Sequence, residues 1–142
     1  MTDPGLAGPS ALRIVLVDDQ RLVRSGFELM LSVEDDIEIV GQAADGQEAL
    51  EVVARTRPDV VLMDVQMPRM DGIEATRRIR RMAGPESRLP ILALTAHAGA
   101  AERTACLEAG CNEVLTKPLD LDVLHRALQR WQPVGMNRGP NS

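Results

Sequence analysis

Five polar side chains stand directly after apolar stretches of the sequence, and their types suit one chemistry. They are Asp18, Asp19, Asp64, Thr95 and Lys117. Three carboxylates held together repel one another unless a cation compensates them, and hard oxygen ligands with room for water suit Mg²⁺. An ammonium and a hydroxyl group complement the oxygens of a tetrahedral anion. Brought together, these groups predict a phosphoryl-transfer site, and an aspartate carboxylate can itself be the nucleophile of such a site and form an acyl phosphate.

The stretches that precede these side chains are typical of buried strands. Val60–Met63 is wholly apolar, ends in Asp64 and leads into a turn with Pro and Gly, as expected for a strand covered on both faces. The same reasoning predicts five strands, at Arg13–Val17, Ile37–Gly41, Val60–Met63, Ile91–Leu94 and Glu113–Thr116.

Apolar residues recur at helical spacing between these strands. The expected helices are Arg21–Leu31, the stretch from Asp45 to just before Pro58, Gly72 to about Met82, Ala101–Ala109 closed by Gly110, and Leu121–Trp131. The inward stripe expected in the first helix pairs Leu22 with Val23, Gly26 with Phe27 and Met30 with Leu31. An arginine run in the third helix is interpreted as a largely outward, solvated face, at Arg77, Arg78, Arg80 and Arg81. Residues 84–88 are expected to form a loop.

Strict alternation of strands and helices predicts an α/β fold, a doubly wound parallel sheet with helices on both faces and right-handed crossovers. The three wholly apolar strands belong in the middle, and the second and fifth, which contain Glu38 and Glu113, belong at the edges. The order 2-1-3-4-5 satisfies this requirement. It brings the ends of the first and third strands together across the topological switch point, with Thr95 and Lys117 added by the next two strands.

Composition excludes several classes of protein. The 142 residues suffice for one domain, expected at 12–131 between disordered tails at 1–11 and 132–142. A net charge of −5 and only two aromatic residues, Phe27 and Trp131, argue against direct binding of nucleic acid. No signal peptide or membrane span is recognisable, so a cytosolic protein is expected. Cys106 and Cys111 are interpreted as core thiols in a reducing compartment.

At the strand ends the chain resembles the receiver domain of two-component response regulators from bacteria. The matching segments are Val17-Asp18-Asp19, Asp64 within Met63–Gly72, Leu94-Thr95-Ala96 and Thr116-Lys117-Pro118. The resemblance extends from about Leu12 to Trp131 and implies a flavodoxin-like (βα)5 three-layer sandwich. It implies that Asp64 accepts a phosphoryl group from a His-phosphorylated sensor kinase or phosphotransfer protein, and that the chain catalyses only its own phosphorylation and dephosphorylation.

The resemblance also implies a ligand set. Mg²⁺ would be held by Asp19, Asp64, the backbone carbonyl of Gln66 and, through water, Asp18. The phosphoryl oxygens would be bound near Thr95, Ala96 and Lys117, with a cis peptide before Pro118. Kinase docking is expected on the start of the first helix and the loop after Lys117, with Arg21, Arg24 and Leu119 as the residues to test.

One position departs from the family pattern. Three residues before Lys117, most receivers carry Tyr or Phe, which turns inward when the threonine moves toward phosphate; this chain has Val114. The usual switch is therefore in question, although the resemblance places a homodimer or downstream effector on the fourth helix, fifth strand and fifth helix. His97 and Gln66 stand where they would tune dephosphorylation, and an exposed loop histidine is an equally good reading of His97.

Two alternatives stay open beside the phosphoacceptor. A small-molecule phosphatase or phosphotransferase of the haloacid-dehalogenase type would also use Asp64 as nucleophile, but it requires a second Asp at the position of Gln66. A pseudo-receiver that binds partners without phosphate would be expected to lack Asp19, Asp64 or Lys117.

The two halves of the chain resemble different branches of the receiver family. Arg13 to Ile79 resembles receivers attached to DNA-binding domains, and the part from Leu94 to Asp120 resembles receivers fused to hybrid sensor kinases.

Overall fold

The computed structural model describes residues 11–67, 70–97 and 99–133. Its elements, in chain order, are β1 Leu12–Val17, α1 Arg21–Leu31, β2 Ile37–Ala43, α2 Gly46–Thr56, β3 Val60–Asp64, α3 Gly72–Arg80, the 3-10 helix η2 Pro85–Arg88, β4 Ile91–Thr95, α4 Ala100–Ala109, β5 Glu113–Thr116 and α5 Leu121–Trp131. All five predicted strands and all five predicted helices are present. The expected tails lie almost wholly outside the described residues, as do Pro68 and Arg69 of the matching segments.

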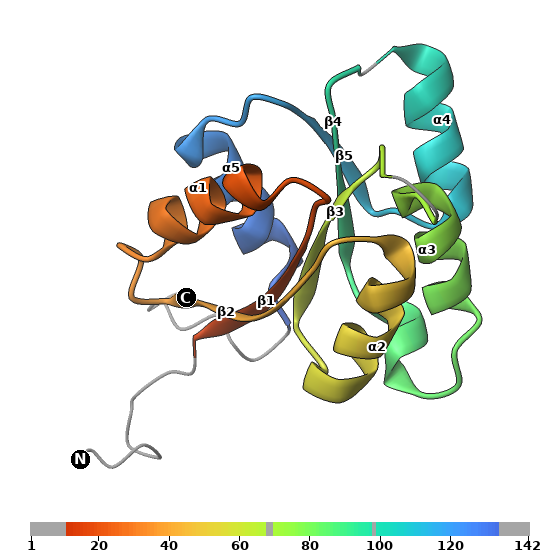
Figure 1. Cartoon of the computed structure of the whole chain (residues 1–142), viewed down its shortest axis with the longest axis horizontal. Helices are drawn as coiled ribbons and strands as arrows, with labels where there is room; N and C mark the ends of the chain where they lie inside the picture. Colours follow the sequence, from red (N-terminus) through yellow and green to blue (C-terminus); the bar gives the residue numbers. More distant parts are fainter. Residues whose placement is uncertain (1–10, 68–69, 98, 134–142) are drawn as a thin grey trace.

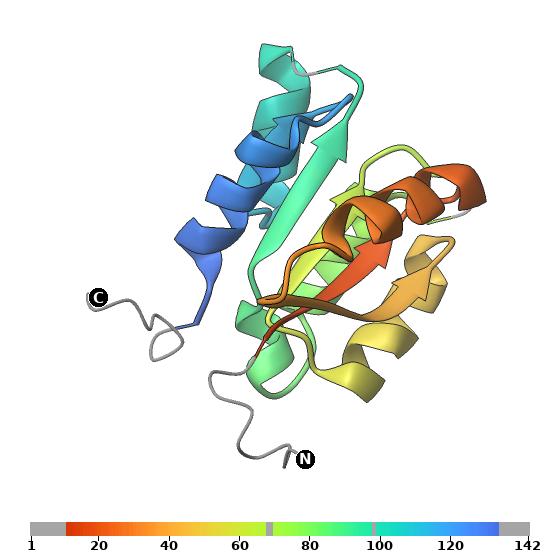
Figure 2. The ribbon, with the colours of Figure 1, turned by 90° about the vertical axis from the view of Figure 1, so that its left-hand side faces the viewer.

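The strands form one parallel sheet in the order β2-β1-β3-β4-β5, which confirms the predicted topology and the edge positions of β2 and β5. The arrows of the strands run in the same direction in Figure 2. The register pairs Val17 with Met63 and Asp64 with Leu94 at the carboxyl ends. Side chains that follow β1, β3, β4 and β5 therefore meet at one edge of the sheet.

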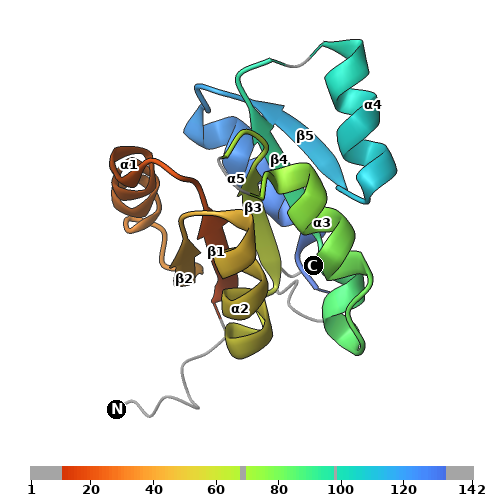
Figure 3. The same cartoon turned by 45° about the vertical axis from the view of Figure 1, so that its right-hand side comes forward.

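Helices cover both faces of the sheet, with α1 and α5 on one side and α2, α3 and α4 on the other (Figures 1 and 3). Alternate residues of the central strands feed two separate cores, because successive side chains of a strand point to opposite faces. Val15, Val61 and Met63 belong to the core under α2, α3 and α4. Leu16 and Leu62 belong to the core under α1 and α5.

The turn after β3 is set by a close approach of α3 to the strand. A Cβ atom on Gly72 would lie 2.3 Å from the carbonyl oxygen of Asp64, so only glycine allows α3 to begin at this distance. The Gly72 amide also donates to the carbonyl of Val65 at 3.0 Å. Asp71 caps the helix by accepting from the amide of Glu74. The backbone that carries Asp64 is thereby held from both sides.

Three expectations about side chains and loops were wrong. Leu22 and Gly26 of the predicted stripe do not face the core, because Leu22 is 83% exposed and Gly26 is also exposed, whereas Phe27 and Leu31 are buried as predicted. The predicted loop at 84–88 contains η2, which begins with a proline at a position where the missing N–H costs nothing. Arg80 is half-buried rather than solvated, and donates to the carbonyls of Ser87, Leu89 and Gly110.

In the part of the chain that the structure describes, no helix has the length and the apolar character needed to cross a membrane.

Candidate functional site

The three predicted acidic residues meet at the carboxyl edge of the sheet. One carboxylate oxygen from each of Asp18, Asp19 and Asp64 lies within 4.8 Å of the others. Asp18 is fully buried and Asp64 is 5% exposed, whereas Asp19 is exposed to solvent. The carboxylates of Asp18 and Asp64 are therefore buried, and the site opens toward solvent on the side of Asp19.

Lys117 supplies the cation of the site from the end of β5. Its Nζ lies 3.0 Å from Asp18 Oδ2 and 3.3 Å from Asp64 Oδ1. The backbone amide of Lys117 donates to the Thr95 carbonyl at 2.8 Å, and this contact continues the β4–β5 pairing into the site. The peptide bond between Lys117 and Pro118 is cis, as the resemblance implied.

Thr95 ends β4 as a fully buried residue whose side chain is already engaged. Its hydroxyl donates to the carbonyl of His97 and accepts from the amide of the same residue, both at 3.0 Å. The loop after β4 is thus coupled directly to the Thr95 side chain. Ala96 and His97 are themselves exposed.

The net effect of burial and neighbouring charges is to raise the pKa of both Asp64 and Lys117, which disfavours the charged form of Asp64 and favours the charged form of Lys117. Burial raises the pKa of the Asp64 carboxyl, and the neighbouring Asp18 carboxylate raises it further, against the opposing effect of Lys117. Burial acts to lower the pKa of Lys117, but its hydrogen bonds to the two carboxylates and their charges outweigh this effect and raise it. The ammonium is therefore held charged, while the Asp64 carboxylate is destabilised by its surroundings.

The donor set fits a hard divalent cation. When all groups are ionised, three carboxylates against one ammonium leave two uncompensated negative charges (−3 + 1 = −2) in a partly buried site. The available donors are oxygen atoms, and the exposure of Asp19 leaves space for water ligands. Gln66, the other predicted ligand, lies beside them, with its backbone amide 3.4 Å from Asp64 Oδ1.

Arg24 has a supporting role that the sequence did not reveal. Its guanidinium donates to the backbone carbonyl of Asp18 at 2.6 Å and to Gln42 Oε1 at 3.2 Å. The amide of Gln20 also donates to Asp18 Oδ1 at 2.9 Å. Arg24 therefore positions the loop that carries the acidic pair, in addition to standing near the surface expected to bind a kinase. No sequence pattern pointed to this contact, because it joins α1 to the neighbouring strand β2.

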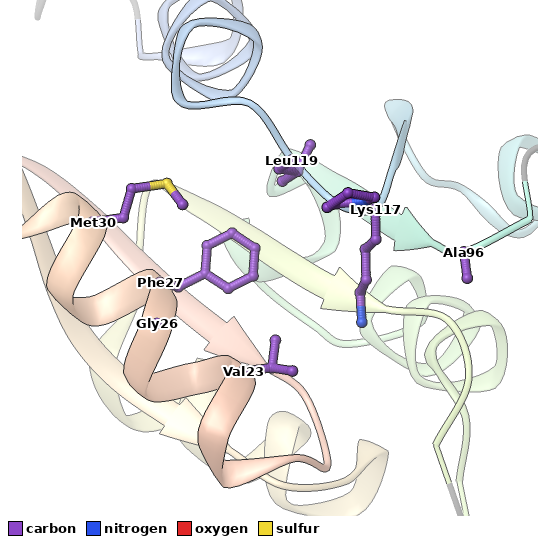
Figure 4. A pocket seen from close by; sticks show the side chains of 8 residues that line it. Val23, Gly26, Phe27, Met30, Ala96, Lys117 and Leu119 are labelled. Carbon is purple, nitrogen blue, oxygen red and sulfur yellow. The ribbon is translucent and has the colours of Figure 1, made fainter.

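A groove of about 530 Å³ opens beside the site between α1 and the loop after β5. Figure 4 shows Val23, Phe27 and Met30 of α1 facing Leu119 across it, while the Lys117 side chain extends toward the ends of the strands. The remaining lining residues are Gly26, Ala96 and Pro118. This groove joins the two segments that were expected to dock a kinase, and its walls are mainly apolar.

Val114 lies within the sheet rather than on an exposed surface. It pairs with Ala93 of β4, is 5% exposed and packs in the core beneath α2, α3 and α4. The position that most receivers give to an aromatic switch residue is therefore filled by a small side chain that is already buried.

Comparison with known proteins gives one consistent family. The family model of the response regulator receiver domain matches residues 14–129. Response regulator MprA from Mycobacterium sp. (strain KMS) is 41% identical over 136 residues, which cover 92% of this chain and 55% of that protein. The chain thus spans about half the length of the curated relatives it matches.

Two solved structures extend the similarity to three dimensions. A two-component response regulator of the LuxR family from Aurantimonas sp. has a TM-score of 0.78 and 37% identity, over 85% of this chain and 84% of that one. The receiver domain of a sensor histidine kinase from Pseudomonas aeruginosa has a TM-score of 0.77 and 39% identity, over 86% and 98%. The latter contains a magnesium ion coordinated in its active-site cleft.

Proposed function

The chain belongs to the response regulator receiver domain family, and on that premise we propose that Asp64 is its phosphoacceptor. The observation that carries this proposal is the position of Asp64, which is buried at the end of β3 with Lys117 Nζ 3.3 Å from its carboxylate. The donor we propose is a His-phosphorylated sensor kinase or phosphotransfer protein. The chain acts as a signalling protein that catalyses only the gain and loss of its own phosphoryl group.

In the proposed step, a carboxylate oxygen of Asp64 attacks the phosphorus atom of a phosphohistidine. The new O–P bond forms as the P–N bond breaks, the imidazole leaves with the electron pair of that bond, and the aspartate becomes an acyl phosphate. The acyl phosphate carries more negative charge than the carboxylate it replaces, so the site needs cations near the transferred group, and Lys117 supplies one of them. Hydrolysis of the acyl phosphate by water later restores the carboxylate and releases phosphate.

The chain's own residues are arranged to receive the transferred group. Lys117 can follow the charge from the Asp64 carboxylate to the phosphoryl oxygens with little movement, because it already bridges Asp18 and Asp64. Thr95 has a hydroxyl able to donate to a phosphoryl oxygen once it releases the carbonyl of His97. Phosphorylation is therefore expected to change the loop that contains Ala96 and His97.

We assign Mg²⁺ to the acidic cluster, with Asp19, Asp64 and the Gln66 carbonyl as ligands and Asp18 acting through water. When bound, the ion neutralises negative charge on the phosphoryl oxygens. The two uncompensated charges of the cluster support this assignment, and a related receiver domain contains magnesium in its cleft.

The biological setting is proposed from the same premise. A homodimer or downstream effector would use the surface of α4, β5 and α5, and the chain would act as a single-domain regulator, a relay intermediate or the receiver of a longer protein. A cytoplasmic location agrees with Cys106 and Cys111, which are both free and buried.

The alternatives have less support. A phosphatase of the haloacid-dehalogenase type needs an acid at position 66, where Gln66 cannot donate or accept a proton in that role. A pseudo-receiver needs no assembled site, yet Asp19, Asp64 and Lys117 are all present, with Lys117 in contact with Asp64.

The test is labelling with acetyl phosphate in millimolar Mg²⁺, read by intact mass. Wild type should gain one acid-labile, hydroxylamine-sensitive phosphate, and Asp64→Ala should gain none. Asp35→Ala is the matched control, because Asp35 is an exposed aspartate between α1 and β2, away from the carboxyl ends of the strands, and it should label normally. Full labelling of Asp64→Ala would overturn the assignment.

A further inference from the structure

A second cluster of metal-binding side chains lies at the opposite edge of the sheet from Asp64. His125 Nε2 is 3.6 Å from Glu34 Oε1 and 4.0 Å from Asp36 Oδ2, and one ligand atom from each residue lies within 4.8 Å of the others. Glu34 and Asp36 stand between α1 and β2, at the amino end of the sheet, and His125 comes from α5. The two elements are about ninety residues apart in the sequence.

The backbone holds the two carboxylates in place. The Asp36 carbonyl accepts from the amide of Leu12 at 2.8 Å, which ties the segment to the start of β1. The amide of Glu34 donates to the carbonyl of Leu31 at 3.0 Å and continues the end of α1. His125 is fixed from the other side, because its neighbours Leu124 and Leu128 on α5 are buried in the core. The meeting of the three side chains is therefore set by the packing of the fold.

The separations suit a bound ion better than a direct hydrogen bond. Both His125 distances exceed the usual N–H···O range of about 2.7–3.2 Å. Ligand atoms about 2.0–2.2 Å from a tetrahedral metal lie about 3.3–3.6 Å from one another. The three ligand atoms lie within 4.8 Å of one another, so side-chain movements of at most about 1.5 Å would bring all three ligands into that range. The side chains are 31% exposed for His125, 26% for Glu34 and 55% for Asp36, so an ion has access from solvent.

We propose that Glu34, Asp36 and His125 form a binding site for a divalent transition-metal ion, with Zn²⁺ as the probe ion. One imidazole and two carboxylates favour zinc-type ions over Mg²⁺ and Ca²⁺, which prefer oxygen ligands alone. Three protein ligands leave a fourth position for water or for a group from another molecule. The ion would link α5 to the segment between α1 and β2, at the opposite edge of the sheet from Asp64.

Isothermal titration calorimetry of the full chain with Zn²⁺ tests the site, with saturating Mg²⁺ present so that the cluster around Asp64 is occupied. One Zn²⁺ per chain is expected, with affinity reduced at least tenfold in His125→Ala and in Asp36→Asn. His97→Ala, which removes the other histidine at an exposed position, should bind as wild type does. Unchanged binding in His125→Ala, or no binding by wild type, would overturn the proposal.

Three further measurements check the proposal without relying on the binding affinity of the variants. Acetyl phosphate labelling of His125→Ala should match wild type, because the cluster is remote from Asp64. In wild type, the ring NMR signals of His125 should shift and saturate at one equivalent of Zn²⁺, while those of His97 stay in place. A shift of His97 alone would assign the ion to the mouth of the phosphoacceptor site and contradict the proposal. Melting in Zn²⁺ at about 100-fold above Kd should raise the Tm by about 5–10 °C.

Discussion

The Asp64 carboxylate is stable in the fold only at the cost of two unfavourable contacts, with the apolar core and with Asp18. Both raise its pKa above the ordinary value of 3.8, and the ammonium of Lys117 offsets only part of the effect. Such a group favours a proton or a nearby metal ion over the bare anion. The same environment therefore supports metal binding, and a cation bound there would offset the additional negative charge of an acyl phosphate.

This raised pKa has a measurable consequence for stability. Between pH 3.8 and the higher pKa of the folded state, the folded chain keeps a proton that the unfolded chain has released, so the unfolding free energy falls as pH rises through this window. In EDTA, wild type should lose stability relative to Asp64→Asn as the pH rises above the ordinary pKa of 3.8, as measured by urea unfolding. Millimolar Mg²⁺ should reduce the difference at the upper end. A difference that is constant with pH would show that Asp64 is not destabilised by burial.

At the scale of elements, Arg80 joins α3 to two later segments. It makes five hydrogen bonds, to the carbonyls of Ser87, Leu89 and Gly110 and to Asn112 Oδ1. Gly110 itself requires glycine, because its φ is +116° and a Cβ there would lie 2.8 Å from the Arg80 side chain. The arginine thus fixes the end of α4 and the start of β5 against α3.

Arg80→Met should lower the unfolding free energy by about 1–3 kcal/mol, because half-buried carbonyl groups lose their donor. Arg77→Met is the control, since the contact of Arg77 among the described residues is an exposed one with Glu74, and it should change stability by less than about 0.5 kcal/mol. Urea unfolding measures both. Equal effects from the two variants would contradict the role assigned to Arg80.

Among the elements, β5 differs from that of most receivers because it carries Val114 at the position of the aromatic switch residue. An aromatic ring that becomes buried on phosphorylation contributes about 1.5–3 kcal/mol by area, whereas Val114 is already buried and contributes little to the difference between states. We expect hydrogen exchange with a beryllofluoride phosphate mimic to change in the Thr95–His97 loop and only weakly across α4 and α5. Val114→Tyr should enlarge the α4 and α5 response. Large changes in wild type that are no greater in the Tyr variant would show that no aromatic residue is needed.

At the scale of the whole molecule, the apolar groove adjoins the proposed phosphoacceptor Asp64, because Lys117 lines the groove and also contacts Asp64. α1 forms one wall and the loop after β5 the other, so a protein seated in the groove would be in reach of Lys117 and the strand ends (Figure 4). This arrangement supports docking of a phosphodonor protein. Because Arg24 holds the Asp18 backbone, Val23 and Leu119 are better residues than Arg24 for a test of kinase docking.

Val23→Asp together with Leu119→Asp should slow phosphotransfer from a kinase or phosphotransfer protein that labels wild type, by at least tenfold, which corresponds to about 1.4 kcal/mol. Acetyl phosphate labelling should be unchanged, because that donor needs no docking surface. Val123→Asp, on the partly exposed side of α5, is the control and should transfer normally. Equal transfer by wild type and the double variant would exclude the groove as the docking surface.

The sequence by itself determined the order of the strands and the identity of the acidic site. Apolar runs that end in polar residues mark both the buried strands and the edge where those polar groups emerge, as Asp18, Asp64 and Thr95 do. Glu38 and Glu113 distinguished the two edge strands, β2 and β5, from the three wholly apolar central strands. These signals are local, and the rules for parallel sheets convert them directly into spatial neighbours.

Only the tertiary structure decided which polar side chains leave the surface and which apolar ones stay on it. Arg80 sits in an arginine run that is typical of a solvated face, yet its partners lie up to 32 residues away. Leu22 fits a buried stripe but remains exposed on the first turn of α1, whereas Phe27 and Leu31 of the same stripe are buried. The groove and the His125 cluster likewise join segments that are far apart in the chain. Such contacts depend on how helices are placed over the sheet, and helical periodicity does not encode that placement.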